Sequence, residues 1–532
     1  MFFENKIWAA AVPYKENENN TVNTGEKLCI LPAMANRHGL IAGSTGSGKT
    51  ISLKVLAESF SDAGVSVMLA DVKGDLAGMC EKGEDSSDIN ERVHKLKLDE
   101  AGFSYKAFPV RFWDVYAQSG LALRTTVTEF GPLLLSRLLE LNQIQSDILN
   151  IVFQIADDEG LLLIDIKDSK AMLNYVSQNS KRYVQDYGNI SSQSINAIIR
   201  SLAVLEQRGG DMFFAEPALD IEDWFKTDEN SRGFINILDS SSLINDSLTY
   251  STFMLWLLSE FFEKLPEAGD LKKPKMVLFF DEAHLLFKDI PKALMQKIEQ
   301  VMKLIRSKGI GVYFISQSPK DIPDEILAQL GNKIQHSLRA YTPAEQKVLK
   351  AAAASYRANP GFDTFKSISE LAVGEALVSF IEADGSPSVV SRAYILPPQS
   401  KIGTVDSQLR KSIIDSDILN KKYFQTFDRD SAYEFLCRLN ADEQQEQLLY
   451  AAKKEADKLN EKEEAAEKKR KEQEEKKLKR NIAGVGTSAL GTIGREIGKD
   501  LGSSVGGKFG KRLGGNVGAS FARGLFKTLF KI

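Results

Sequence analysis

Eight consecutive residues near the start of the chain have the composition of a phosphate-binding loop. They are Gly43, Ser44, Thr45, Gly46, Ser47, Gly48, Lys49 and Thr50, and they match the pattern G-x-x-x-x-G-K-[ST] in full. The glycines let successive backbone N–H groups point inward and cradle phosphate oxygens. The lysine brings a positive charge to the phosphates as a catalytic cation, and the threonine hydroxyl is a Mg²⁺ ligand. The loop therefore predicts binding of ATP with Mg²⁺.

A second group of candidate residues ends an apolar run in the middle of the chain. Residues 276–280 read Met-Val-Leu-Phe-Phe and are followed by Asp281 and Glu282. Five consecutive apolar residues indicate a strand that is buried on both faces of a parallel sheet. We expect Asp281 to bind the Mg²⁺ water shell and Glu282 to activate the water that attacks the γ-phosphate. A glutamate at this place predicts turnover of the nucleotide rather than static binding.

Two polar residues flank another apolar run and could complete a hydrolysis site. Gln317 directly follows the run 310–316, where it could contact the γ-phosphate or the attacking water. Arg306 stands near the end of the predicted helix before this run and is a candidate arginine finger. A basic residue at a helix C-terminus is also explained by the helix dipole, so both interpretations of Arg306 stay open.

Two further aspartates, Asp71 and Asp75, follow the β-branched-rich run 65–70. Carboxylates at the carboxyl end of a strand beside a phosphate loop can hold Mg²⁺ through water or orient a base. Aspartates also form turns for purely structural reasons. The sequence does not decide between these two interpretations.

Strand-like and helix-like segments alternate around these residues from position 40 to about 397. The apolar runs typical of strands are 40–42, 65–70, 108–115, 233–238, 275–280, 310–316, 335–340, 375–381 and 389–396. Segments with helical spacing separate many of these runs, and a longer helical block, at about 121–230, falls between two strand-rich halves. This alternation indicates an α/β domain with a mainly parallel sheet and an inserted helical subdomain.

Together these motifs resemble the HerA/FtsK superfamily of ring-forming P-loop ATPases, and within it the bacterial HerA-like group of the YjgR type. The resemblance covers residues 39–398. Besides the phosphate loop it rests on three stretches: 71–75 (Asp-Val-Lys-Gly-Asp), 279–287 (Phe-Phe-Asp-Glu-Ala-His-Leu-Leu-Phe), and 304–309 (Leu-Ile-Arg-Ser-Lys-Gly) with Ser316 and Gln317.

The resemblance implies a RecA-like core, a homo-hexameric ring with ATP at the subunit interfaces, and Arg306 reaching into the site of a neighbouring subunit. It also implies ATP-driven translocation, usually along double-stranded DNA. HerA proper carries a β-barrel of about domain size before its phosphate loop, whereas about forty residues precede the loop here. The nuclease partner that HerA engages is therefore not implied for this chain.

The chain changes in composition after position 398. Residues 399–440 are predicted to be a linker with some helix. Residues 441–480 hold twelve acidic and twelve basic residues and are typical of a solvated charged helix or a weak coiled coil. In residues 481–532, glycine recurs at every fourth position from 494 to 518, and the net charge is +6. This basic, amphipathic, glycine-rich helical tail favours binding to a membrane surface; self-association and a disordered segment that grips nucleic acid stay open.

Overall composition bears on the compartment and the partner. The 532 residues carry a net charge of −4 and include three cysteines without metal or disulfide spacing. The mild acidity argues against a protein that coats nucleic acid, and the cysteines indicate a reducing compartment. No signal peptide is apparent. We expect a cytoplasmic protein, with peripheral association at the inner face of the membrane if the tail binds lipid.

The leading hypothesis is a Mg²⁺-dependent ATPase that works as a ring-shaped DNA translocase or helicase. DNA is expected as the substrate only because of the family resemblance, since no helix-turn-helix, zinc finger or basic-aromatic module is visible in the sequence. Two alternatives remain: a membrane-associated ATPase that moves protein or DNA, and a nucleotide-gated scaffold whose output is assembly.

Overall fold

The computed structural model describes residues 1–13, 15–16, 22–23, 25–288 and 290–483. The chain divides into two units, Met1–Leu439 and Asn440–Ile532. The predicted glycine-rich tail at 481–532 lies outside the described residues except for its first three positions. Among the described residues, no helix is both long and apolar enough to cross a bilayer.

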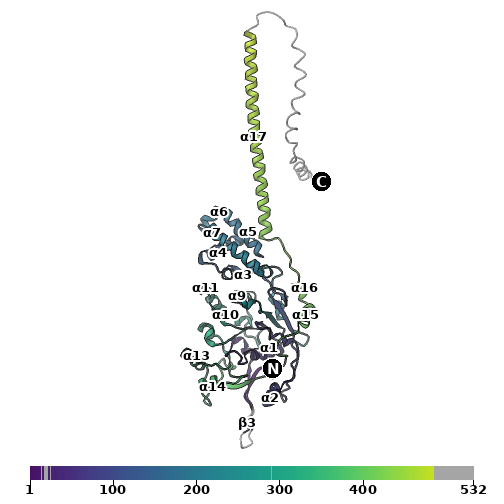
Figure 1. Cartoon of the computed structure of the whole chain (residues 1–532), viewed down its shortest axis with the longest axis vertical. Coiled ribbons are helices and arrows are strands. Elements are labelled where there is room, and N and C mark those ends of the chain that lie inside the picture. The colour runs from purple at the N-terminus through teal and green to yellow at the C-terminus, as the bar shows by residue number, and fades with distance from the viewer. Residues whose placement is uncertain (14, 17–21, 24, 289, 484–532) are drawn as a thin grey trace. The chain divides into compact units, whose positions relative to one another are not determined.

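A sheet of thirteen strands forms the centre of the first unit (Figure 1). Its parallel part has the order β13-β6-β12-β11-β7-β10-β8-β9. These strands are β13 (Asn332–Gln335), β6 (Gly39–Ala42), β12 (Ile310–Ser316), β11 (Met276–Phe280), β7 (Ser66–Asp71), β10 (Ile235–Asp239), β8 (Val110–Asp114) and β9 (Leu121–Ala122). The predicted α/β fold with a mainly parallel sheet is confirmed.

Antiparallel strands extend the sheet beyond β13. They are β14 (Glu375–Ser379), β15 (Ser391–Ile395), β2 (Lys6–Ala11) and β1 (Phe2–Phe3), with β5 (Lys27–Ile30) also paired to β2. Strands β3 (Lys15–Glu16) and β4 (Val22–Asn23) form a separate two-stranded sheet. Strands β1, β2 and β5 therefore belong to the same sheet as β6, which leads into the phosphate loop.

Helices cover both faces of the parallel strands. Helix α1 (Lys49–Asp62) packs on one face, and α9 (Ser247–Lys264), α10 (His284–Phe287) and α11 (Lys292–Leu304) pack on the other. Neighbouring residues of one strand face opposite cores: Leu278 joins the core under α9, and Phe279 joins the core under α1. Both side chains are fully buried, which accounts for the continuous apolar run of β11.

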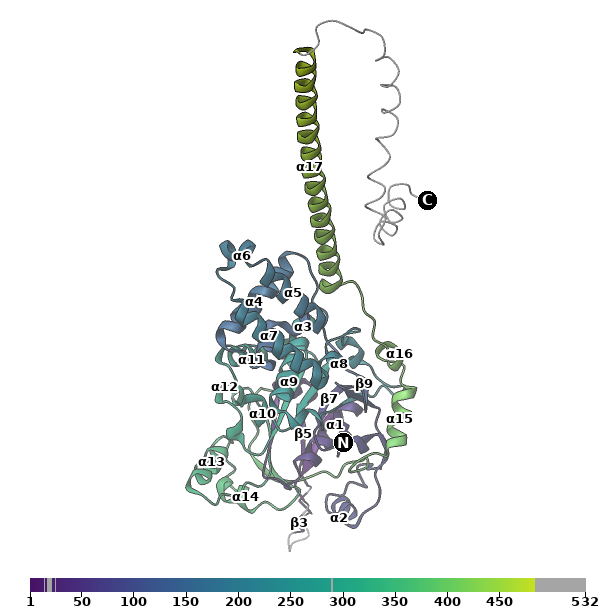
Figure 2. The ribbon, with the colours of Figure 1, turned by 45° about the horizontal axis from the view of Figure 1, so that its top comes forward.

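The helical block between β9 and β10 packs as a group. It contains α3 (Val127–Leu138), α4 (Gln143–Asp158), α5 (Ile166–Gln178), α6 (Ser180–Tyr187), α7 (Ser192–Leu205) and α8 (Asp211–Phe213), with a π-helical turn at Glu206–Gly210. Figure 2 shows α4, α5 and α7 close to one another, and α3 contacts both α4 and α9. The insertion thus shares one continuous core with the α9 face of the sheet.

The remaining helices lie around the sheet or after it. They are α2 (Ser87–Lys95), α12 (Asp324–Leu327), α13 (Pro343–Ala354), α14 (Thr364–Glu370), α15 (Ser407–Ser416), α16 (Asn420–Tyr423) and α17 (Ala432–Ala483). Short 3-10 turns occupy Pro32–Arg37, Ala77–Cys80, Ile221–Phe225, Leu243–Asn245, Ile305–Lys308 and Pro319–Asp321. The predicted charged helix at 441–480 lies within α17, where every side chain described from 441 to 477 is exposed.

Two sequence predictions need correction. The strand predicted at 335–340 ends at Gln335, because the carbonyl of Ser337 turns toward the phosphate loop and accepts a hydrogen bond from it. The linker predicted at 399–440 is part of the first unit. Its residue Asp417 forms an ion pair of 2.9 Å with the buried guanidinium of Arg111 on β8, and the ring of Tyr423 packs on Trp113.

Candidate nucleotide site

The phosphate loop joins the end of β6 to the start of α1. In the register of the sheet, Ala42 at the end of β6 lies opposite Ser316 of β12 and Gln335 of β13. Gly48 precedes α1 in a left-handed conformation with φ of 107°, which suits a residue without a side chain. The loop therefore stands at the N-terminus of a 14-residue helix, where free N–H groups and the helix dipole favour phosphate.

The neighbouring strands support the loop through its backbone. The amide and the hydroxyl of Ser44 both donate to the carbonyl of Ser337, at 2.9 and 3.0 Å. A Cβ atom on Gly43 would lie 2.5 Å from the Cβ of His336, so only glycine fits there. The loop is thus shaped by residues that follow β13.

His336 is a site residue that the sequence analysis missed. Its Nε2 lies 2.7 Å from the hydroxyl of Ser52 on α1, and burial lowers its pKa to about 4, with a smaller contribution from Lys49. A neutral imidazole therefore packs beneath the phosphate loop. No sequence motif marks this histidine; only the pairing of β13 with β6 brings it to the site.

The loop side chains are arranged to receive an anion. Nζ of Lys49 donates to the carbonyls of Gly43 and Ser44 at 2.6 and 3.1 Å. Burial lowers the pKa of the Lys49 ammonium, which Glu282 and Asp281 oppose. The hydroxyl of Ser47 is buried, and no described residue hydrogen-bonds to it. Phosphate oxygens would satisfy both the ammonium and this hydroxyl, so the loop residues fit a nucleotide.

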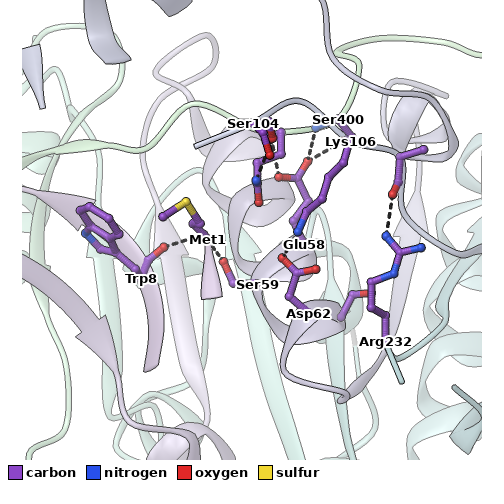
Figure 3. A network of polar contacts seen from close by, with 12 residues as sticks. Met1, Trp8, Glu58, Ser59, Asp62, Ser104, Lys106, Arg232 and Ser400 are labelled. Carbon is purple, nitrogen blue, oxygen red and sulfur yellow. Dashed lines mark hydrogen bonds and ion pairs between the residues drawn. The ribbon is translucent and has the colours of Figure 1, made fainter. Parts of the chain in front are cut away.

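Helix α1 is held firmly on the side away from the loop (Figure 3). The carboxylate of Glu58 accepts hydrogen bonds from the amides of Gln399 and Ser400 at 2.8 and 3.1 Å. Asp62 pairs with Lys106 at 2.7 Å, and the amino group of Met1 donates to the hydroxyl of Ser59. Segments that are distant in sequence therefore fix the helix that carries the phosphate loop.

Asp281 and Glu282 follow β11, at the same edge of the sheet as the phosphate loop. In the strand order, β12 lies between β11 and β6. Oδ1 of Asp281 accepts a hydrogen bond from the amide of Glu282 at 2.8 Å, and the hydroxyl of Tyr250 donates to the Asp281 carbonyl at 2.8 Å. Desolvation raises the pKa of Asp281 to about 6, while Lys73 and Lys49 act in the opposite direction. A desolvated carboxylate of this kind is stabilised by a cation.

Mg²⁺ usually takes one or two protein carboxylates and completes its shell with substrate phosphates and water. No group of three or more His, Cys, Asp or Glu residues within the described part of the chain could hold a metal. Thr50 in the first turn of α1 and Asp281 at the tip of β11 supply hydroxyl and carboxylate oxygens. The residues therefore fit Mg²⁺ bound together with a nucleotide, not a metal held by protein alone.

Glu282 has an unusual backbone and two close polar neighbours. Its φ is 48°, which is uncommon for a residue with a side chain and costs about 1–3 kcal/mol. Its Oε1 lies 3.9 Å from Nζ of Lys73, and its Oε2 lies 3.4 Å from Nδ1 of His284. Lys73 and His284 lie in two of the stretches that carry the family resemblance, 71–75 and 279–287, but no role is predicted for either residue.

The structure supports the turn interpretation of Asp71. Its carboxylate accepts hydrogen bonds from the amides of Gly74 and Leu76 at 2.7 and 3.1 Å. Burial raises its pKa to about 6, and the nearby Asp75 adds to the effect. Asp71 therefore shapes the turn that carries Lys73.

Gln317 and Arg306 lie at opposite ends of β12. Gln317 is exposed and directly follows Ser316, which pairs with Ala42 at the end of β6. Gln317 is therefore close to the edge of the sheet that carries the phosphate loop. Arg306 precedes the strand, whose seven residues span about 20 Å. Its guanidinium is partly exposed and lies 3.9 Å from Asp270. Arg306 therefore does not reach the phosphate loop of its own chain.

Comparison with known proteins places these features in a family. The model of the Helicase HerA-like C-terminal family matches residues 16–513. The DNA double-strand break repair helicase HerA of Sulfolobus acidocaldarius is 24% identical over 352 residues, which are 64% of this chain and 62% of the relative. The HerA of Sulfurisphaera tokodaii is 23% identical over 348 residues, with the same coverage. The chain thus spans about 62% of the length of these relatives.

Among solved structures, the plasmid coupling protein TrwB in complex with ADP and Mg²⁺ has a TM-score of 0.48 at 14% identity, covering 70% of this chain and 88% of TrwB. VirB4 of Thermoanaerobacter pseudethanolicus has a TM-score of 0.43 at 15% identity, covering 75% and 98% of the two chains. The family assignment rests on the sequence match, which covers most of the chain. The protein is a member of the HerA-like helicase C-terminal family.

Proposed function

We propose that this protein is a Mg²⁺-dependent ATPase that drives a ring-shaped motor along DNA. The observation that carries the proposal is the convergence of Lys49, Asp281 and Glu282 at one edge of the sheet, where burial lowers the pKa of the Lys49 ammonium and the two carboxylates oppose that shift. A phosphate loop by itself supports nucleotide binding, and an adjacent carboxylate supports hydrolysis.

Each residue has a distinct part in the reaction. The Lys49 ammonium exchanges the two loop carbonyls for phosphate oxygens, and the loop amides bind the remaining charge. Thr50 and Asp281 would hold Mg²⁺, which neutralises charge that develops on the phosphates. Glu282 accepts the proton of the attacking water, and Gln317 orients that water from the tip of β12.

The proposed partners are further copies of the chain and double-stranded DNA. The curated relatives are named as DNA double-strand break repair helicases, which supports DNA as the substrate. Arg306 lies at the edge of the sheet opposite the loop. This position supports the resemblance-based idea of a RecA-like hexamer in which Arg306 completes the site of a neighbour.

The test is ATP hydrolysis with Mg²⁺, measured with and without linear duplex DNA, for the wild type and Glu282→Gln. We expect stimulation by DNA and a loss of about 10²–10⁴-fold in kcat for the variant, the usual range for removal of a general base. A hydrolysis rate that does not change with DNA would favour the membrane-associated alternative. Co-flotation with liposomes, for chains with and without residues 481–532, would test that alternative. No hydrolysis in either protein would leave the nucleotide-gated scaffold.

The position of Arg306 is tested by mixing two inactive variants. Lys49→Ala retains Arg306 but lacks a working phosphate loop, whereas Arg306→Ala retains the loop. If Arg306 acts on a neighbour, mixed rings contain some complete sites and recover a measurable fraction of the wild-type rate. If the mixed rings are shown to exchange subunits but recover no ATPase activity, Arg306 does not act on the site of a neighbouring subunit.

A further inference from the structure

The loop after β7 presents a lysine to the catalytic carboxylate. Gly74 adopts φ of 74°, and the Asp71 carboxylate binds the amides of Gly74 and Leu76, which together fix a tight turn. Lys73 stands inside this turn, and its ammonium faces Glu282 from the adjacent strand. The fold therefore places the backbone of Lys73 within reach of Glu282, although the lysine side chain itself is exposed.

Each oxygen of the Glu282 carboxylate has a basic side chain near it. Oε1 faces Lys73 at 3.9 Å, Oε2 faces His284 at 3.4 Å, and the peptide that joins Glu282 to Asp281 is held by Tyr250. A general base needs an oxygen free to accept a proton from water within hydrogen-bond reach. In this arrangement the Lys73 ammonium lies beside an oxygen that the attacking water needs, whereas Nδ1 of His284 makes no hydrogen bond with any described residue.

The contact between Lys73 and Glu282 is weak enough for Lys73 to change partners. The ammonium side chain is 56% exposed, and 3.9 Å is longer than a charge-assisted hydrogen bond. Lys73 also acts on Lys49 as a repulsive neighbour, so the two cations share the environment of the phosphate loop. The charge of a nucleoside triphosphate bound at Lys49 would draw the Lys73 ammonium more strongly than one carboxylate does.

We propose that Lys73 restrains Glu282 in the nucleotide-free protein and releases it by moving to the terminal phosphate of bound ATP. Lys73 is in this role a positioning residue that makes the base available only when a triphosphate is present. The inference rests on the proposed role of Glu282 in hydrolysis, but the movement of Lys73 can be observed without turnover.

The first experiment reports on the contact itself. A carbodiimide couples a lysine directly to a carboxylate with which it pairs, and mass spectrometry then quantifies the Lys73–Glu282 cross-link. We expect the cross-link in nucleotide-free protein and with ADP, and a strong loss with Mg²⁺ and a non-hydrolysable ATP analogue. The pair Lys297–Glu263, at 3.1 Å between α11 and α9, is the internal reference and should not respond to nucleotide. A Lys73–Glu282 cross-link that persists with the ATP analogue overturns the proposal.

The second experiment reports on the consequence for the chemical step. Lys73→Met should lower the single-turnover hydrolysis rate without DNA by about two- to five-fold, the range that corresponds to an exposed ion pair, because the variant lacks the cation that moves to the terminal phosphate. Lys73→Arg keeps the cation and should restore the wild-type rate, and Lys297→Met is the matched control. An unchanged or higher rate in Lys73→Met, with folding intact by circular dichroism, contradicts the movement of Lys73 to the phosphate. If the wild type does not hydrolyse ATP but the cross-link still responds to the analogue, the proposed function fails while the exchange of Lys73 stands.

Discussion

At the scale of single residues, the site collects carboxylates whose surroundings disfavour their charge. Desolvation raises the pKa of Asp281 to about 6, and burial raises that of Asp71 to the same value. Lys73 and Lys49 offset part of the cost of burying the Asp281 charge, but the pKa of Asp281 stays raised. Such residues lower the stability of the empty protein and make it gain from a bound cation.

Asp281→Asn is therefore expected to stabilise the nucleotide-free protein at neutral pH while it removes Mg²⁺-dependent hydrolysis. The raised pKa means that folded Asp281 binds its proton more tightly than unfolded Asp281. Its stabilising contribution is present below pH 4 and is lost as the pH rises through about 6. At pH 7.5 the variant should gain about 1–3 kcal/mol in free energy of unfolding, and the gain should vanish near pH 4.

Urea denaturation at the two pH values, without Mg²⁺ or nucleotide, measures this difference. Asp186→Asn, at an exposed position of α6, is the control and should change the free energy of unfolding by less than about 0.5 kcal/mol. A loss of stability at pH 7.5 in Asp281→Asn would show that the carboxylate is compensated by contacts that the amide cannot make.

At the scale of elements, α1 combines a phosphate-binding end with a buried polar stripe. Lys54 and Glu58 are almost fully buried and bind backbone groups of residues 399–401. This polar stripe breaks the amphipathic pattern of an ordinary surface helix. The segment after β15 thus anchors the helix that begins with Lys49.

Glu58→Gln tests this anchor. The glutamine would turn its NH₂ group toward backbone donors that now meet a carboxylate, so at least one buried donor loses its partner. We expect a loss of about 1–3 kcal/mol in free energy of unfolding, measured by chemical denaturation. Glu91→Gln on the exposed face of α2 is the matched change and should have little effect. Equal effects of the two substitutions would rule out the anchor.

At the scale of the whole molecule, the first unit includes the beginning of α17. Ala432 and Leu436 are buried at 0% and 2% exposure. The hydroxyl of Ser431 and the amide of Tyr433 donate to the Asp168 carboxylate on α5 at 2.6 and 2.8 Å. The first turns of α17 therefore belong to the packed core, although the helix continues into the second unit.

Two truncated chains test whether the first turns of α17 stabilise the first unit. A chain that ends at Asn440 should keep the thermal midpoint of the first unit, because it retains all of these contacts. A chain that ends at Ser431 loses Leu436 and the amide of Tyr433, and should lose about 2–5 kcal/mol in stability. Thermal unfolding followed by circular dichroism, together with nucleotide binding, distinguishes the two. Equal midpoints for both truncations would show that the core does not need the start of α17.

Local signals in the sequence identified the parts of the site that depend on short stretches of chain. The loop Gly43 to Thr50 and the pair Asp281–Glu282 are recognisable because backbone conformation, charge and strand burial act within a few residues. The main parallel strands followed from the same reasoning, since apolar runs buried on both faces leave a clear pattern. The predicted strand at 335–340 failed because its end is set by a contact with the loop, not by its own composition.

Tertiary structure alone decided which residues meet. His336 under the loop and Lys73 beside Glu282 come from separate strands, and no spacing in the sequence connects them. Likewise, only the direction of β12 shows that Gln317 lies at the edge of the sheet that carries the phosphate loop, while Arg306 lies about 20 Å away at the other end of the strand. The physical reason is that each motif is encoded by neighbours along the chain, whereas its partners are selected by strand order and by packing between segments hundreds of residues apart.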